Sequence, residues 1–128
     1  MQFKALEEKL GYVFKNIKLL ELALIHKSSN NISNNERLEF LGDTILNTII
    51  SEYLFVKFPN EKEGILTRMR SHLVKGETLS KKAIEIDIIK FIKLSKGTAL
   101  LSETRKHSIL EGSVESIIGA VFLDSNWK

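Results

Sequence analysis

Three carboxylates recur along one stretch of the chain at a spacing that could hold a metal ion. At about 100° per residue, Glu36, Glu39 and Asp43 lie within roughly 60° of each other on one helix face. Repulsion between solvated like charges at this spacing costs only tenths of a kcal/mol, so a solvated acidic face is the alternative. Ser33 has the spacing of a capping box with Glu36, which would give that acid a structural role. No such role is available to the two deeper acids.

Phe40 stands among these acids, away from the apolar face of the same helix. That apolar face is a stripe at i, i+3, i+7 and i+11, formed by Leu38, Leu41, Ile45 and Ile49. A phenyl ring on a polar face predicts that something outside the helix covers it. Either a partner chain or another part of the same fold would do so.

A second acidic helix is predicted from about Ser108 to about Asp124. Its core stripe consists of Leu110, Val114, Ile117 and Val121. Glu115 lies about 100° from that stripe, at its edge. Ser108 and Glu111 have capping-box spacing, which predicts a structural role for Glu111.

Gly112 is unusual in the interior of this second helix. A glycine at such a position costs up to about 1 kcal/mol relative to alanine, and nothing in the local sequence accounts for it. Ser113 and Ser116 nearby are also weak helix formers. Close packing against the first acidic helix and an altered functional site are two explanations that the sequence leaves open.

Basic side chains gather in two further segments. The first contains Arg68, Arg70, Lys75, Lys81 and Lys82, and the second is Arg105-Lys106-His107. Clustered Lys and Arg suit contact with nucleic-acid phosphates, and a solvated face is the alternative. Glu63 opens the helix of the first segment, where the spacing from Asn60 also fits a capping role.

The composition excludes several kinds of site. The 128 residues carry 19 Lys+Arg and 16 Asp+Glu, a formal charge of +3, and no Cys. Thiol nucleophiles, disulfides and Cys-ligated metals are therefore excluded, and His26, His72 and His107 show no ligand spacing. No phosphate-cradling Gly-rich loop is present, so no nucleotide cofactor is expected. No local motif indicates a Ser/His/Asp nucleophile.

The elements that must position these residues are predicted to be helices in a single domain. Helices are expected over about 3–10, 17–26, 34–57, 63–75, 77–86 and 108–124, with 28–35 and 96–107 as loops and 88–92 either helical or extended. No apolar run approaches the roughly 20 residues of a membrane-spanning helix. The N-terminus also lacks the apolar stretch of a secretory peptide. We therefore expect a cytoplasmic protein with no membrane partner.

One long segment connects these residues to a known family. Asn35-Glu36-Arg37-Leu38-Glu39-Phe40-Leu41-Gly42-Asp43-Thr44-Ile45-Leu46 closely resembles the motif of ribonuclease III, a family of double-stranded-RNA endonucleases. Other similar stretches extend along almost the whole chain. They are 23–28, 63–64 with 68–76, 108–110 and 115–124. The resemblance is closest to the bacterial enzymes.

The resemblance implies an all-α ribonuclease III endonuclease-domain fold that works as a homodimer on double-stranded RNA. It further implies Mg²⁺ in each active site, with Mn²⁺ as the expected substitute. Asp43 and Glu115 match catalytic residues, and together with Glu39 they match the metal ligands. Glu36 and Glu63 match accessory acids near the site or the dimer interface.

The resemblance also implies a role for Phe40 and a pattern of cutting. Phe40 matches an aromatic residue that enters a socket on the partner subunit, which favours a partner chain as its cover. Products in this family carry a 5′-phosphate and a 3′-hydroxyl, and the paired cuts leave short 3′ overhangs. Two sites related by a twofold axis would make both cuts, with the RNA recognised by its A-form shape. The expected role is RNA processing.

The chain departs from the family pattern in two respects. An acid, usually Asp, stands three residues before the last-helix glutamate in the family, and here that residue is Gly112. We expect slower or more metal-demanding cleavage; the alternatives are a catalytically impaired RNA-binding scaffold dimer and a dimeric helical module without RNA. Residues 1–128 are expected to form the endonuclease domain. Bacterial relatives usually carry a C-terminal double-stranded-RNA-binding domain, which we expect to be absent from this chain, either because the chain is an excised nuclease domain or because the protein lacks that module.

Overall fold

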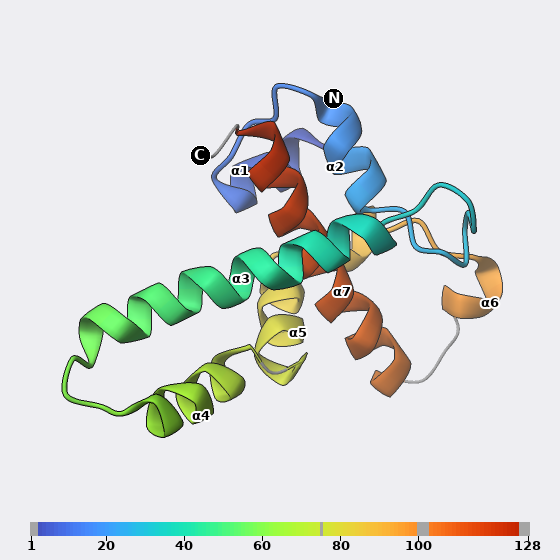
Figure 1. Cartoon of the computed structure of the whole chain (residues 1–128). Helices are drawn as coiled ribbons and strands as arrows, with labels where there is room; N and C mark the ends of the chain where they lie inside the picture. Colours follow the sequence, from blue (N-terminus) through green and yellow to red (C-terminus); the bar gives the residue numbers. More distant parts are fainter. Residues whose placement is uncertain (1–2, 75, 100–102, 126–128) are drawn as a thin grey trace.

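The computed structural model describes residues 3–74, 76–99 and 103–125, and the named secondary-structure elements in these ranges are all helices (Figure 1). Its helices are α1 (Lys4–Leu10), α2 (Ile17–Ala23), α3 (Glu36–Lys57), α4 (Glu63–Leu73), α5 (Gly76–Glu85), the 3₁₀ helix η1 (Ile88–Phe91), α6 (Lys96–Ala99) and α7 (Glu103–Asp124). The prediction of an all-α fold is confirmed. The only pairing of extended backbone within the described residues is an isolated bridge between Ile25 and Lys93.

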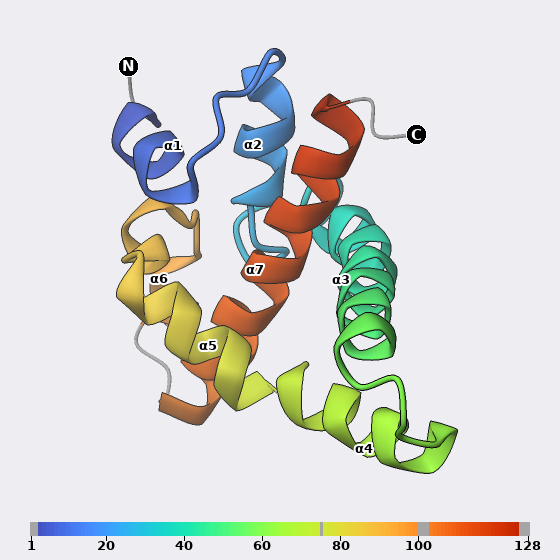
Figure 2. The same cartoon turned by 90° about the vertical axis from the view of Figure 1, so that its left-hand side faces the viewer.

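Helix α7 runs through the middle of the molecule. It packs against α3 on one side and against α5 and α2 on others, and Figure 2 shows it between α3 and the remaining helices. Leu110 and Ile117 of its predicted stripe are buried, and Val114 and Val121 pack against the same core. The stripe predicted for the last helix is therefore confirmed, and α7 is the element against which the site residues of α3 are positioned.

The C-terminal half of α3 and the whole of α4 project from this body as an arm (Figure 1). The two helices contact each other, and the Arg70 guanidinium donates to the Ser51 hydroxyl at 2.8 Å. Ile49 is 41% exposed, so the apolar stripe predicted for α3 is buried at Leu38 but not at its far end. Phe55 and Val56 on the arm are also exposed.

The structure corrects several predicted boundaries. Helix α2 ends at Ala23 instead of His26, because the following backbone pairs with Lys93: the His26 amide donates to the Lys93 carbonyl at 3.0 Å. Helix α4 ends at Leu73, and Gly76 opens α5 instead of ending α4. Lys75, which we assigned to a basic segment, lies outside the described residues.

The last helix begins earlier than predicted. It starts at Glu103, and α6 precedes it, so the loop predicted over 96–107 is wrong. The segment between Glu103 and Ser108 is rich in charged residues with good helix propensity and contains no breaker. The charged residues of this segment are therefore part of a helix, although we had interpreted them as a loop.

All three predicted capping arrangements are wrong. Asn35 is the N-cap of α3, so Ser33 does not pair with Glu36 in a capping box. Lys62 precedes α4 without a side-chain cap, and Ser108 is an interior residue of α7. Asn35 is held in place because it is buried and its side-chain amide donates to the Ala23 carbonyl at 3.1 Å. Among the described helices, none has the length and apolar character to cross a membrane.

Candidate active site

The site is built where α3 crosses α7 at very close range. A Cβ atom added to Gly42 would overlap the carbonyl oxygen of Glu115, and one added to Gly119 would overlap that of Leu38. Only glycine lets two helix backbones approach in this way, since any side chain would separate them. The crossing therefore brings the acidic face of α3 directly over α7.

Two buried serines of α7 lie near the crossing, and Ser116 links α7 to the end of α2. Ser116 donates its hydroxyl to the Ala23 carbonyl at 2.7 Å, the same carbonyl that accepts from Asn35. Ser113 donates its hydroxyl to the Ile109 carbonyl at 2.9 Å. The Ala23 carbonyl at the end of α2 thus accepts hydrogen bonds both from the start of α3 and from the middle of α7. These serines are weak helix formers with a packing role.

Acidic side chains from both helices line one cavity at this crossing. The cavity has a volume of about 420 Å³, and its lining residues are Glu36, Glu39, Phe40, Asp43, Glu111 and Glu115. Glu39, Asp43 and Glu115, the acids matched to metal ligands, thus meet although they lie far apart in the chain. Glu36 is at the exposed rim, where it forms an ion pair with Lys27 at 3.9 Å.

The electrostatics of this cavity disfavour full ionisation. Burial raises the pKa of the Glu115 carboxyl to about 8, and a hydrogen bond with Asp43 and the negative charge of that neighbour add to the rise. Burial also raises the pKa of Glu39, with the charges of Glu36 and Glu111 as the next causes. These neighbouring carboxylates repel each other when all are ionised. A cation bound between them would offset that repulsion, so the cavity is a candidate cation site.

Gly112 lies beside Glu39 and lines a second cavity that adjoins the acidic one. A Cβ atom on Gly112 would lie 2.8 Å from the Oε2 atom of Glu39, so the glutamate carboxylate occupies the space next to this glycine. The structure therefore explains the glycine: without a side chain at residue 112, α7 leaves room for the Glu39 carboxylate of α3. Gly112 also supplies no carboxylate of its own.

The donor chemistry fits a hard divalent cation. Mg²⁺ binds carboxylate oxygens, commonly one or two, and keeps several waters. Asp43 and Glu115 are near enough to share a hydrogen bond, and Glu39 lines the same wall. No group of three or more His, Cys, Asp or Glu side chains in the described part of the chain is already arranged around a common point. The pair of Asp43 and Glu115 is therefore the minimum set of residues that could hold such an ion.

Phe40 is 79% exposed, so no described part of its own fold covers it. It lines the acidic cavity on one side and an apolar groove on the other. The apolar lining of that groove is formed by Leu19, Leu22, Ile32, Leu38, Leu41 and Leu123. Of the two covers that the sequence left open, the one within the same chain is wrong for these residues.

Glu63 is not brought to the acidic cavity within this chain. It lies at the start of α4, on the arm, and lines a separate cavity of about 460 Å³ together with Ser51, Phe55 and Arg70. The arm projects away from the crossing of α3 and α7 (Figure 1). The matched accessory acids are therefore split, with Glu36 at the cavity and Glu63 remote from it.

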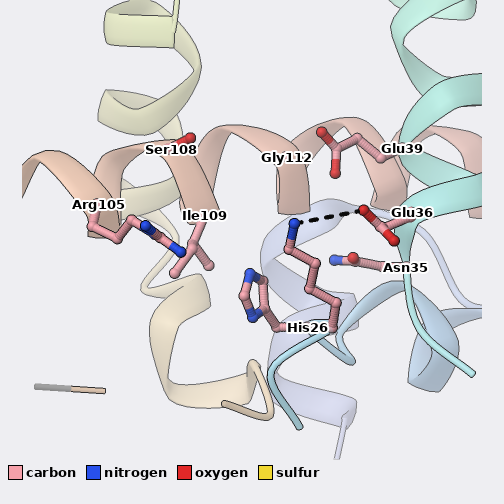
Figure 3. Close-up of a pocket in the computed structure, with 9 residues that line it drawn as sticks. His26, Asn35, Glu36, Glu39, Arg105, Ser108, Ile109 and Gly112 are labelled. Atoms are coloured by element: carbon pink, nitrogen blue, oxygen red, sulfur yellow. Dashed lines mark ion pairs between the residues drawn. The ribbon is translucent and has the colours of Figure 1, made fainter. Parts of the chain in front are cut away.

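The sequence left two roles open for Glu111: a capping box with Ser108, or, because it adjoins Gly112, a side chain that reaches into the site. The structure favours the second, because Glu111 lines the acidic cavity and its charge contributes to the raised pKa of both Glu39 and Glu115. The second cavity beside the acids, shown in Figure 3, was missed because its lining comes from three separate segments.

The chain is similar to known proteins in both sequence and structure. A family model described as ribonuclease-III-like matches residues 16–128. A relative named Ribonuclease 3 from Marinomonas sp. (strain MWYL1) is 49% identical over 123 residues, covering 96% of this chain and 54% of the relative. Another of that name, from Hahella chejuensis, is 46% identical and is covered to 56% of its length. The chain thus spans about half the length of these relatives.

Solved structures similar to this chain include a ribonuclease III nuclease domain and a Dicer. A nuclease domain of ribonuclease III from Campylobacter jejuni, described for flexibility in a region involved in dimer formation, superposes with a TM-score of 0.92 at 41% identity. The match covers 96% of this chain and 86% of that one. Dicer from Pichia stipitis superposes with a TM-score of 0.67 at 32% identity, over 88% of this chain and 47% of that one.

Proposed function

This chain belongs to the ribonuclease-III-like family, and from that membership we propose that it is the nuclease domain of an endoribonuclease that cleaves double-stranded RNA. The family resemblance inferred from the sequence is confirmed. The observation that carries the proposed activity is the meeting of Glu39 and Asp43 from α3 with Glu115 from α7 in one cavity. Acids from two helices can approach an ion from two sides, which one helix face cannot do.

In this proposal Glu39, Asp43 and Glu115 hold Mg²⁺, and Mn²⁺ can replace it. A bound divalent ion supplies charge neutralisation at the phosphate and a more acidic water for in-line attack. Asp43 and Glu115 lie next to the reacting phosphate and keep the hydrolytic water oriented. Glu36 at the rim is an accessory acid. Gly112 leaves the ligand set one carboxylate short, so we expect a higher metal requirement than in relatives with an acid there.

The proposed products carry a 5′-phosphate and a 3′-hydroxyl, with short 3′ overhangs. Such overhangs need two cuts on opposite strands, and a twofold dimer provides two sites at a fixed separation. The RNA duplex would be recognised by its A-form backbone, with little reading of sequence. From the family membership we also infer a role in cytoplasmic RNA processing.

The proposed homodimer is supported by Phe40 and the groove beside it. Isologous interfaces place the same patch of both subunits in contact, so a protruding side chain and the pocket that receives it both lie on that patch. Phe40 is exposed and adjoins the apolar groove that contains Leu22, Leu41 and Ile32. In the proposed dimer, the Phe40 ring of each subunit enters the groove of the other. Glu63 on the arm would then be near the partner's surface.

The proposed activity is tested by incubating the protein with a perfect RNA duplex over a range of Mg²⁺ and Mn²⁺ concentrations. We expect cleavage with the stated ends, and a loss of at least about 100-fold in Glu115→Gln, since even outer-shell partners of a metal typically contribute 10–100-fold. Glu52→Gln, on the same long helix as Asp43 but outside the cavity, is the matched control and should cleave like wild type. Absence of cleavage at every metal concentration would contradict the proposal.

Gly112 supports a second candidate, a catalytically impaired RNA-binding scaffold dimer. The position that carries an acid in the family pattern is here buried and filled by the Glu39 carboxylate. This candidate predicts that wild type binds duplex RNA without cutting it, and that Gly112→Asp gains activity. Cleavage by wild type at millimolar Mg²⁺ would exclude it.

A further inference from the structure

A cavity of about 360 Å³ adjoins the acidic cavity and carries basic groups. Its basic side chains are His26 and Lys27, which follow α2, and Arg105 near the start of α7. Figure 3 shows the Arg105 guanidinium extending toward the His26 ring, with Glu36 and Glu39 on the opposite side. These two glutamates line both cavities, so the basic cavity begins where the acidic one ends.

The hydrogen bonds of His26 fix which ring nitrogen carries the proton. The amide of Ser28 donates to Nδ1 at 3.1 Å, so Nδ1 must be the unprotonated acceptor. The Ser28 hydroxyl lies 2.8 Å from the same nitrogen and accepts from the Ser95 amide at 3.0 Å. The ring therefore carries its proton on Nε2. Among the described residues Nε2 has no hydrogen-bond partner, which leaves a donor for a ligand.

The surroundings of His26 favour the neutral ring. Burial lowers the pKa of the imidazole, and the positive charges of Lys27 and Arg105 lower it further, against a smaller opposing effect of the Glu36 carboxylate. The neutral ring held by Ser28 presents an N–H group in a fixed direction, which costs little ordering when a ligand arrives.

Lys27 and Arg105 supply charge to the same cavity. The ion pair between Lys27 and Glu36 spans 3.9 Å between side chains that are 58% and 60% exposed, so it holds the lysine only weakly. Arg105 presents a planar set of donors that suits oxyanions. Each of these three groups can donate a hydrogen bond to a ligand, and Glu36 and Glu39 lie on the opposite side of the cavity. Donors that gather on one side suit the acceptor oxygens of a phosphate.

We propose that His26, Lys27 and Arg105 hold a backbone phosphate of the RNA strand next to the phosphate that is cut. This inference rests on the proposed function, because it places the contact beside the acids of that site. The contact carries no sequence information and sets the register of the strand. The positive charges of Lys27 and Arg105 would attract the phosphate to their side of the cavity, away from the carboxylates of Glu36 and Glu39, which repel it.

The proposal is tested by duplex-RNA binding in EDTA, where no cleavage occurs. We expect Lys27→Ala/Arg105→Ala to bind about tenfold more weakly at low salt and to reduce the slope of log K against log salt by about 1. The charge-matched control Lys4→Ala/Lys9→Ala, on α1, should keep the wild-type slope. His26→Asn preserves an acceptor for the Ser28 amide but lacks the Nε2 donor, and it should also bind more weakly while remaining folded.

A duplex carrying a neutral methylphosphonate at single positions identifies the phosphate. Wild type should lose affinity at one position beside the cut, and the Lys27→Ala/Arg105→Ala variant should be insensitive there. Equal binding and an equal methylphosphonate profile in wild type and variant would overturn the basic cavity alone. A wild-type protein that binds no duplex RNA would overturn the proposed function as well, so the two failures are distinguishable.

Discussion

The carboxylate of Glu39 on α3 lies where a side chain on residue 112 of α7 would begin: a Cβ atom at Gly112 would stand 2.8 Å from Glu39 Oε2. The contact is with the far end of a flexible side chain. Glu39 can therefore move aside for a larger residue at low cost, whereas the backbone contacts at Gly42 and Gly119 cannot yield in the same way.

Gly112→Asp should lower the Mg²⁺ concentration needed for half-maximal cleavage by about tenfold, because it adds a carboxylate to the wall that carries Glu39. Gly112→Asn has nearly the same size without the charge and serves as the control. Cleavage rates measured over a metal titration compare the two. An equal change in both variants would show that space, not charge, limits the site.

Glu115→Gln should stabilise the metal-free protein as pH rises. The pKa of Glu115 is raised from 4.5 to about 8, chiefly by burial. The stability of the folded wild type is therefore highest below about pH 4.5, where Glu115 is protonated, and falls as the pH rises toward about 8. Glutamine resembles the protonated acid at every pH. The Tm of the variant in EDTA should therefore exceed that of wild type at pH 8 and converge with it at pH 4. A Tm difference independent of pH would contradict this account of the cavity.

Phe40→Ala should weaken the proposed dimer. An anchoring aromatic side chain of an interface commonly contributes about 2 kcal/mol or more, which corresponds to roughly 30-fold in the dissociation constant. Sedimentation over a range of protein concentrations measures the change. Tyr53→Ala, another exposed aromatic of α3 that lines neither the groove nor the acidic cavity, is the comparison. An unchanged dimer in Phe40→Ala would remove Phe40 from the interface.

Gly119→Ala should destabilise the fold, because the added methyl group would overlap the Leu38 carbonyl and force α3 and α7 apart. Overpacking of this kind costs about 1–3 kcal/mol. Gly64→Ala on α4 is the matched control, since a Cβ there meets nothing within 4 Å and helix propensity improves by up to about 1 kcal/mol. Urea unfolding of both variants should give opposite signs.

The helical class, the acidic face of α3 and the core stripe of α7 could be predicted because each follows from periodicity within one element. The local spacing of Glu39 and Asp43 placed them on one face, and the family resemblance connected them with Glu115. The crossing that brings them together depends on Gly42 and Gly119 meeting backbone from another helix. No single-element pattern reports such a contact.

The capping predictions were wrong because they rested on local sequence spacing, and tertiary contacts determined where the helices begin. Ser33 and Ser108 have capping-box spacing, but Asn35 is fixed by a hydrogen bond to Ala23 and α7 extends back to Glu103. Of the two roles left open for Glu111, the structure rules out the cap, and the side chain lines the acidic cavity. The sequence indicated Arg105 as part of a basic cluster suited to phosphate, but it did not connect Arg105 with His26 and Lys27, which come from a separate segment and meet it only in the fold.

The most direct test of the central claim is a calorimetric titration of Mn²⁺ into wild type, Glu115→Gln and Glu52→Gln. If Glu39, Asp43 and Glu115 grip a divalent ion at the crossing of α3 and α7, wild type and Glu52→Gln bind Mn²⁺ with the same affinity, and Glu115→Gln binds it at least about tenfold more weakly. Equal binding by all three proteins, or none by wild type, would contradict the account.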